Sequence, residues 1–195
     1  MTNFNIQNTD SVTKNYQKGL LPQRNKKDIY YFDSSSRSDL SKFKLSSENR
    51  RILKKTENFN YQLIPLKDFK FDLQLQKKIY SWIKKLNWDF PISSVKTIFT
   101  NHIFNYLYIW SIDHQPVAYS ICYFNQDIYH IAYVFYNPEL QNNNLPIRLV
   151  LQTIIDSHQK ALKYCYLGRF SKETGYYKRN MPGFEYFDNN QWRTI

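Results

Sequence analysis

The chain has 195 residues, the length of one domain with a sizeable hydrophobic core, and no apolar run long enough to span a membrane. Its net charge of +11 and pI of about 9.5 favour a polyanionic partner such as nucleic acid or an anionic membrane surface, with general solubility as the alternative. Its 4 glycines are too few for most Gly-rich phosphate-binding loops, and we expect no signal peptide and a cytoplasmic location.

The N-terminal part of the chain is polar. We expect a partly disordered segment over residues 1–26, followed by a single domain over residues 27–195. Residues 28–32 fit a short strand, and the serine-rich stretch DSSSRSDLSKF that follows predicts a loop. Ser46 then predicts the N-cap of a helix that ends near Thr56.

The helix predicted after Ser46 is strongly basic. Arg50, Arg51, Lys54 and Lys55 lie at i, i+1, i+4 and i+5, so they share one helical face. Cations on one face repel each other, which costs stability unless an anion binds there. We therefore interpret this face as a site for phosphate groups, with a solvated basic face as the alternative.

The middle of the chain predicts a helix and then a meander of strands. Residues 61–66 fit a strand in which Pro65 marks either a sheet edge or the end of the strand, and Asp72 predicts the N-cap of a second helix. A short helix is expected near residues 94–100. Residues 105–112 and 117–124 flank the tight turn DHQP, which predicts an antiparallel hairpin.

A strand, helix and strand over residues 127–168 form the centre of the prediction. The stretch DIYHIAYVFY is apolar at almost every position, which is typical of a strand covered on both faces. Pro146 marks the first turn of a helix that continues to about Leu162, and a short strand over residues 164–167 is closed by Gly168. Such a right-handed unit has parallel strands and binds ligands where the strands end, at residues 137–145 and from 168 onward.

The order of these elements predicts an α/β (α+β) domain with a mixed sheet. Helices come first, followed by three strands in a meander, a helix and a further strand. This order resembles the GNAT acyltransferase core, whose sheet is splayed where an acyl donor enters. The choice of a GNAT-like, single-domain fold rests on this analogy.

Three stretches resemble the arginyl- and leucyl-tRNA–protein transferases, which extend protein N-termini in the N-degron pathway. FKLSSENRRILKK, at residues 43–55, is similar to the family's F-x-P-S-x-x-x-R-R-x-x-[RK] segment. YVFYNPELQNNNLPIRLVLQTI is similar to Y-x-F-Y-[DN]-P followed by S-L-G and a helix. YCYLGRF and GYYKRNMPGFE resemble Y-x-Y-L-G-Y followed by Y-K-x-x-F-x-P-x-E.

Order and spacing agree from about residue 16 to residue 192. The departures include Leu45, Pro146, Met181 and Gly183, which stand where the family has Pro, Gly, Phe and Pro.

A further departure concerns metal binding. The family usually carries cysteines of C-x-x-C type before the basic helix, where this chain has Ser34, Ser35 and Ser36. A hydroxyl cannot replace a thiolate as a soft metal or iron–sulfur ligand. Cys122 and Cys165 fall inside predicted strands, where we expect free, buried thiols. We expect no metal, and no cofactor other than aminoacyl-tRNA as co-substrate.

The resemblance implies transfer of an Arg- or Leu-class amino acid from aminoacyl-tRNA to the N-terminal α-amino group of an acceptor protein or peptide. An α-amine is partly neutral at physiological pH and the ester is activated, so alignment and charge stabilisation can carry much of the rate. The sequence offers no G-x-S-x-G nucleophile. His102, His114, His130 and His158 lack metal-ligand spacing, and we expect His130 and His158 to be core or half-buried. A monomer that binds no membrane is expected.

We assign roles to the residues of the matched motifs as hypotheses. Tyr177 stacks on the terminal adenosine, and Lys178 stabilises the oxyanion or anchors the terminal phosphate, with anchoring favoured because lysine is flexible. Glu185 binds the attacking ammonium and relays its proton, or forms a salt bridge to Lys178. Arg37 pairs with an acidic side chain of the acceptor, or is a surface arginine. The basic helix, with Arg50, Arg51, Lys54 and Lys55, holds tRNA phosphates.

Two other function classes remain open. An acetyl-CoA-dependent GNAT N-acetyltransferase would share the fold, but such enzymes usually carry a Q/R-x-x-G-x-G/A turn before the helix that follows the central strand. Here that position reads QNNNLPIR, without glycine and with a proline that removes one amide donor. A non-catalytic tRNA- or peptide-binding relative is the other class, favoured if the missing cysteines are essential.

Overall fold

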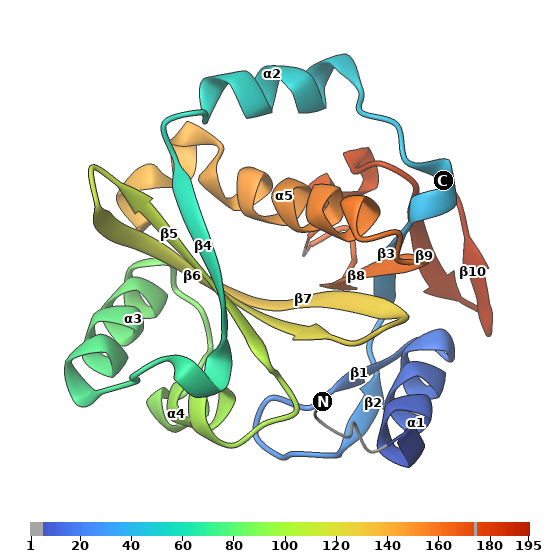
Figure 1. Ribbon diagram of the computed structural model, residues 1–195, viewed down its shortest axis with the longest axis horizontal. Coiled ribbons are helices and arrows are strands. Elements are labelled where there is room, and N and C mark those ends of the chain that lie inside the picture. The colour runs from blue at the N-terminus through green and yellow to red at the C-terminus, as the bar shows by residue number, and fades with distance from the viewer. Residues whose placement is uncertain (1–5, 174) are drawn as a thin grey trace.

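The structure, a computed structural model, describes residues 6–173 and 175–195, and its centre is a mixed sheet (Figure 1). In the described part of the chain the strand order is β10-β9-β3-β8-β7-β6-β5-β4, with β7 and β8 parallel and the other neighbours antiparallel. The strands of this sheet are β3 (Ser35–Asp39), β4 (Asn60–Pro65), β5 (Tyr106–Ile112), β6 (Gln115–Phe124), β7 (Ile128–Tyr136), β8 (Tyr164–Arg169), β9 (Phe184–Asp188) and β10 (Gln191–Arg193). β1 (Leu20–Pro22) and β2 (Tyr30–Phe32) form a separate antiparallel pair.

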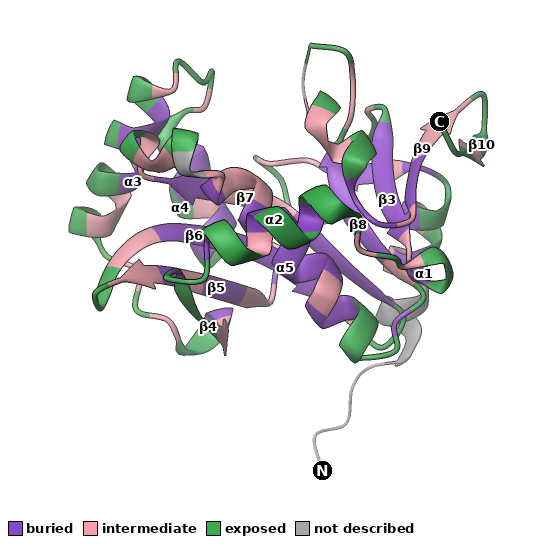
Figure 2. Ribbon diagram, turned by 90° about the horizontal axis from the view of Figure 1, so that it is seen from above, coloured by how far each residue is buried: buried purple, intermediate pink, exposed green. Residues whose placement is uncertain are grey.

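Helices cover both faces of the large sheet. The helices are α1 (Ile6–Gln17), α2 (Ser47–Lys55), α3 (Leu73–Lys85), α4 (Ile92–Thr100) and α5 (Leu145–Gln159). α5 lies on one face with α2 outside it, and α1, α3 and α4 lie on the other face (Figure 1). Each face has its own hydrophobic cluster. Many of the buried residues belong to the strands of the sheet and to α5 (Figure 2).

Local signals predicted several of these elements correctly. The Ser46 side chain accepts a hydrogen bond from the Asn49 backbone N–H and completes a capping box at the start of α2. The Asp72 side chain caps α3 by accepting a hydrogen bond of 2.8 Å from the Leu75 N–H. The 105–124 hairpin and the parallel β7–α5–β8 unit are also confirmed, and β4, which contains Pro65, lies at a sheet edge.

The prediction of a loop over DSSSRSDLSKF was wrong, because this stretch contains β3, an interior strand of the sheet. β3 lies between β8 and β9, and Ser35, Ser36 and Ser38 are fully buried. Buried hydroxyls need partners, and Ser36 and Ser38 donate to the backbone carbonyls of Gly168 and Pro182. These partners are distant in sequence, so the polar stretch gives no local indication of a strand.

The ends of the chain also contribute more structure than their composition predicts. Residues assigned to a partly disordered segment form α1 and β1, and Tyr16 of α1 is fully buried; residues 1–5 of that segment lie outside the described residues. β9 and β10 extend the sheet beyond β3 and were not predicted. Among the described helices, none combines the length and apolarity needed to cross a membrane.

Candidate active site

The parallel strands β7 and β8 separate shortly after they begin. They pair only from Ile128↔Tyr164 to His130↔Tyr166. On its other side, β7 carries one extra residue, Ala132, between the pairs Cys122↔Ile131 and Ile121↔Tyr133. Such a β-bulge bends a strand and is frequent beside active sites. The bulge and the early end of pairing therefore open the sheet at its centre.

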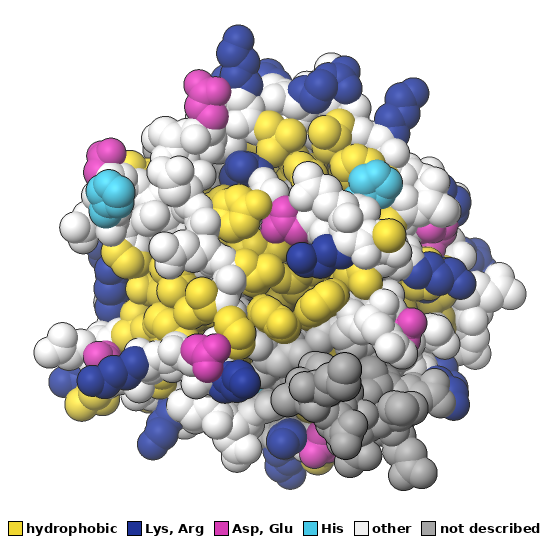
Figure 3. All heavy atoms as spheres, viewed as in Figure 1, with side chains coloured by type: hydrophobic (Ala, Val, Ile, Leu, Met, Phe, Trp, Pro, Cys, Tyr) yellow, Lys and Arg dark blue, Asp and Glu magenta, His cyan; other side chains and the backbone are white. Residues whose placement is uncertain are grey.

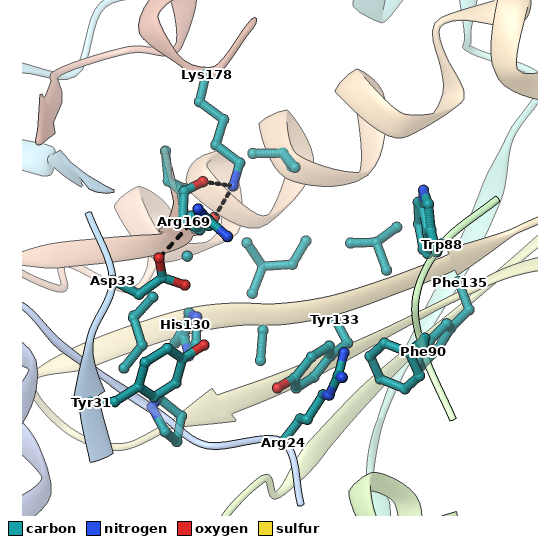
Figure 4. Close-up of a pocket in the computed structure, with 18 of the residues that line it drawn as sticks. Arg24, Tyr31, Asp33, Trp88, Phe90, His130, Tyr133, Phe135, Arg169 and Lys178 are labelled. Atoms are coloured by element: carbon teal, nitrogen blue, oxygen red, sulfur yellow. Dashed lines mark hydrogen bonds and ion pairs between the residues drawn. The ribbon is translucent and has the colours of Figure 1, made fainter. Parts of the chain in front are cut away.

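A pocket of about 420 Å³ occupies this opening. Its lining includes the diverging ends of both strands, residues 130–135 of β7 and 167–169 of β8, together with Tyr177 and Lys178. Trp88 and Phe90 form an aromatic wall at one end, and Tyr31, Asp33 and Arg169 form a polar wall at the other (Figure 4). A mostly apolar cavity with a few converging polar groups is typical of a small-molecule or active site.

Lys178 enters the pocket from the 3-10 helix at Tyr176–Asn180 and is held by the end of β8 (Figure 4). Its Nζ donates to the carbonyl oxygens of Leu167 at 2.6 Å and Arg169 at 2.7 Å. Burial lowers the pKa of the Lys178 ammonium to about 8, and the nearby Asp33 carboxylate opposes this shift. The lysine is thus a fixed cation, where the sequence suggested a flexible one.

Tyr177, the neighbour of Lys178, also lines the pocket and packs against the hydrophobic cluster under α5. Burial raises the pKa of its hydroxyl, so the phenol stays neutral. The structure thus brings together two of the three residues that the sequence assigned to catalysis.

Glu185, the third of those residues, lies outside the pocket lining, in a buried ion pair with Arg37. Arg37 Nε donates to Glu185 Oε2 at 2.9 Å, and Lys42 Nζ lies 2.7 Å from Oε1. The Arg37 guanidinium is buried between the rings of Tyr164 and Trp192. The alternatives of a Glu185–Lys178 salt bridge and of a surface Arg37 are therefore wrong. The assigned roles of Arg37 with an acceptor and of Glu185 with an ammonium would require displacing this pair.

The basic residues of α2 are all exposed, and they lie along the outer surface of the molecule (Figure 3). Arg51 pairs with Glu48, and Arg50 donates to the Leu45 carbonyl oxygen. The buried Asn49 side chain donates to the Asn180 carbonyl oxygen at 3.3 Å. This hydrogen bond connects the basic helix to the segment that carries Lys178.

Sequence reasoning placed His130 in the core and missed its position at the pocket. The His130 side chain is buried, its Nδ1 lies 2.8 Å from the Tyr16 hydroxyl, and its Nε2 has no hydrogen-bond partner in the described part of the chain. Burial, then the Lys178 charge, lower its pKa to about 3, so the ring is neutral. His158, expected to be core or half-buried, is instead exposed in the last turn of α5 and stacks on Phe43.

Asp33 is a second pocket residue that sequence reasoning missed. Its Oδ1 lies 3.0 Å from Arg169 Nε, so a carboxylate and a guanidinium flank one mouth of the pocket. Asp33 comes directly before a run of three serines, and its place in the site depends on the unpredicted β3 that follows it.

We expect purified protein to contain neither zinc nor iron in stoichiometric amounts. Among residues 6–173 and 175–195, no three His, Cys, Asp or Glu side chains form a group that could hold a metal ion, and Cys122 and Cys165 are free and buried. Elemental analysis by mass spectrometry checks this expectation. One equivalent of either metal, retained through gel filtration, would contradict it.

No protein-family model matches this chain, and no curated protein matches it. Among solved structures, the C-terminal DUF2156 domain of a proposed lysylphosphatidylglycerol synthetase from Agrobacterium fabrum is similar with a TM-score of 0.51 and 11% identity, over 70% of this chain and 46% of that one. A GCN5-related glucosamine N-acetyltransferase region of a fungal multi-domain β-N-acetylglucosaminidase has a TM-score of 0.50 and 13% identity, over 93% of this chain and 22% of that one.

The chain thus spans less than half the length of either structure. Identities this low show the fold alone. The mixed sheet, the splay between β7 and β8 and these two similarities agree: the chain has the α/β fold of the GNAT acyltransferases.

Proposed function

We propose that this protein is an acyltransferase that moves an amino acid from aminoacyl-tRNA to the N-terminal α-amino group of an acceptor protein or peptide. The observation that carries the proposal is the pocket at the splay of β7 and β8, with the fixed Lys178 cation inside it and aromatic side chains at one end. The resemblance of three sequence stretches to the aminoacyl-tRNA–protein transferases supplies the donor and acceptor.

The reaction needs no protein nucleophile. The acceptor amine attacks the carbonyl carbon of the aminoacyl ester, and the carbonyl π electrons move to oxygen. When the tetrahedral intermediate collapses, the bond to the ribose oxygen breaks, and that oxygen takes up the proton that the amine loses. The pocket's task is to hold the ester and to stabilise the negative oxygen, for which a fixed cation in a site of low dielectric is suited.

The donor's tRNA body would lie along α2 in this proposal. Arg50, Arg51, Lys54 and Lys55 are exposed, and the Asn49–Asn180 hydrogen bond ties their helix to the Lys178 segment. Cationic side chains on one face bind phosphates without reading sequence.

An acetyl-CoA-dependent N-acetyltransferase is the second candidate, because one of the two similar structures is named as an acetyltransferase region. The loop before α5 argues against it. That loop is filled by a 3-10 helix at Pro138–Asn143, Asn144 provides no side-chain cap, and Pro146 lacks an amide hydrogen in the first turn of α5. A pyrophosphate would find fewer backbone donors there than a Gly-rich turn offers.

A transfer assay with two donors tests the proposed function. The protein is incubated with a pool of charged tRNAs or with acetyl-CoA, and with peptides beginning in Asp, Glu, Lys or Arg, and the products are weighed by mass spectrometry. Vesicles of phosphatidylglycerol serve as an alternative acceptor, since the other similar structure is named for an aminoacylated lipid. We expect aminoacylated peptides. Acetylated peptides, aminoacylated lipid alone, or no product with charged tRNA would each contradict the proposal.

Replacing Arg50 and Arg51 by Ala should weaken tRNA binding and reduce its salt dependence. Each lost phosphate contact lowers the slope of log affinity against log salt by about one unit. Binding is measured by fluorescence anisotropy at several salt concentrations. The matched control replaces Lys77 and Lys84, two exposed lysines of α3 on the opposite side of the sheet, by Ala. An unchanged slope in the α2 variant, or an equal change in both, contradicts the role of α2.

A further inference from the structure

Two side-chain nitrogen atoms, His130 Nε2 and Lys178 Nζ, lie next to the same small space beside Gly168. Gly168 has a φ of +76°, and a Cβ built on it would lie 3.8 Å from His130 Nε2 and 3.9 Å from Lys178 Nζ. Because glycine has no Cβ, nothing of its own side chain fills the space between these two nitrogens. His130, Gly168 and Lys178 all line the splay pocket, so this space opens to it (Figure 4).

The hydrogen bond to Tyr16 decides which nitrogen of His130 carries the proton. The Tyr16 hydroxyl is fully buried and its pKa is raised well above the usual value by burial, so it keeps its proton. A buried O–H needs an acceptor, and His130 Nδ1 lies 2.8 Å away. Nδ1 therefore accepts, and the neutral ring carries its own proton on Nε2. That N–H is the donor without a partner among the described residues.

Lys178 contributes the second donor. An ammonium has three N–H groups, and the carbonyl oxygens of Leu167 and Arg169 accept two of them. These two bonds fix the orientation of the third. The half-buried ammonium is also close enough to His130 to oppose a second positive charge on the imidazole ring.

We propose that His130 Nε2–H and Lys178 Nζ–H together form an oxyanion-binding site, which holds the carbonyl oxygen of the acyl group above Gly168. The inference rests on the proposed function, since it assigns the charge that develops during acyl transfer to these two donors. The carbonyl oxygen gains a full negative charge when the amine–carbon bond forms, and both donors then shorten their hydrogen bonds to it. Tyr16 is a positioning residue, because it holds the imidazole in the required tautomer.

A role of His130 as general base fits the same geometry less well. A base would have to take up a proton beside the Lys178 cation, inside a site that already holds the His130 pKa near 3. A group with so low a pKa is a poor general base for an attacking amine at neutral pH. A neutral histidine that only donates has no such difficulty.

The test combines nitrogen-15 NMR of the histidine side chains with single-turnover kinetics. The NMR probe is a 3′-aminoacylamide of adenosine, a stable analogue of the aminoacyl-tRNA end whose amide carbonyl stands in for the ester carbonyl. We expect the His130 spectrum to show the Nε2–H tautomer, and its Nε2–H proton signal to move downfield when the analogue binds. An Nδ1–H tautomer, or a signal that the bound analogue leaves unchanged, would overturn the inference.

The kinetic arm uses four variants. His130→Ala should lower the plateau rate about 10²- to 10³-fold, as loss of one oxyanion donor does elsewhere, with little change in the tRNA concentration at half-maximum. His130→Gln, which keeps an N–H donor, should recover part of that loss, and Tyr16→Phe should lower the rate and shift the tautomer toward Nδ1–H. The matched control is His158→Gln, at the exposed end of α5, which should behave as wild type.

Failure of the inference and failure of the proposed function look different. If wild-type protein transfers amino acids and His130→Ala keeps the full plateau rate, the oxyanion site is wrong and the proposed function survives. If wild type transfers nothing from any donor, the proposed function fails, and the NMR arm alone decides on the oxyanion site. In that case a downfield shift of the His130 Nε2–H signal with the analogue supports the oxyanion site, and an unchanged signal contradicts it.

Discussion

Replacing Lys178 by Met should lower the single-turnover plateau of aminoacyl transfer by about 10²-fold or more and leave the apparent tRNA dissociation constant nearly unchanged. Anchoring of the terminal phosphate, the role favoured from sequence, assumed a flexible lysine. In the structure two carbonyl oxygens hold the Lys178 ammonium at 2.6 and 2.7 Å, inside the pocket. A cation fixed in this way acts mainly on charge that develops in the transition state.

The pH dependence of transfer provides a control for this prediction. The pKa of Lys178 is lowered to about 8 by burial, so the cation is present below that pH and lost above it. The wild-type plateau should therefore fall as the pH rises through about 8, whereas Lys178→Arg, if active, should stay flat there because arginine keeps its charge. If Lys178→Met raises the apparent tRNA dissociation constant and leaves the plateau unchanged, Lys178 anchors the terminal phosphate instead.

Replacing Glu185 by Ala should cost about 3–5 kcal/mol of unfolding free energy, because it leaves the Arg37 guanidinium buried without its counter-ion. The pair is buried: the side chains of Arg37 and Glu185 are each 8% exposed, and Arg37 lies 3.7 Å from the Tyr164 ring centroid and 4.0 Å from that of Trp192. The measurement is urea denaturation followed by tryptophan fluorescence.

Two controls separate a structural Glu185 from a catalytic one. Glu139→Ala breaks the exposed Lys85–Glu139 pair and should change stability by less than about 1 kcal/mol. The double replacement Arg37→Met with Glu185→Leu removes both charges and should cost less than Glu185→Ala alone. If Glu185→Ala keeps wild-type stability and loses transfer activity, Glu185 acts on the reaction, as the sequence resemblance suggested.

The elements that the sequence predicted well are those specified by neighbours in the chain. Ser46 and Asp72 cap helices through groups three residues away, and the antiparallel pairing of β5 with β6 follows from the short turn between them. The same local reasoning does not predict β3. Ser36 and Arg37 are satisfied by Gly168 and Glu185, which lie 132 and 148 residues further along the chain. No local pattern contains that information.

The site was predictable only in part for the same reason. Tyr177 and Lys178 could be found from their motif, and both line the pocket. His130 could not, because a histidine inside an apolar strand has the pattern of a core residue. Its role depends on the end of β7–β8 pairing at His130↔Tyr166 and on a hydrogen bond to Tyr16, in a segment for which no helix was predicted. Asp33 likewise required knowledge of β3.

The most direct test of the central claim, that the aminoacyl group binds at the splay of β7 and β8, is a crystal structure with the 3′-aminoacylamide of adenosine. We predict density for the aminoacyl group between the two strands, with its carbonyl oxygen within hydrogen-bonding distance of Lys178 Nζ and His130 Nε2, and with the adenosine against Tyr177. An analogue bound elsewhere, for example in the hollow between Lys55 and Asn142, with the splay pocket empty, would contradict the account.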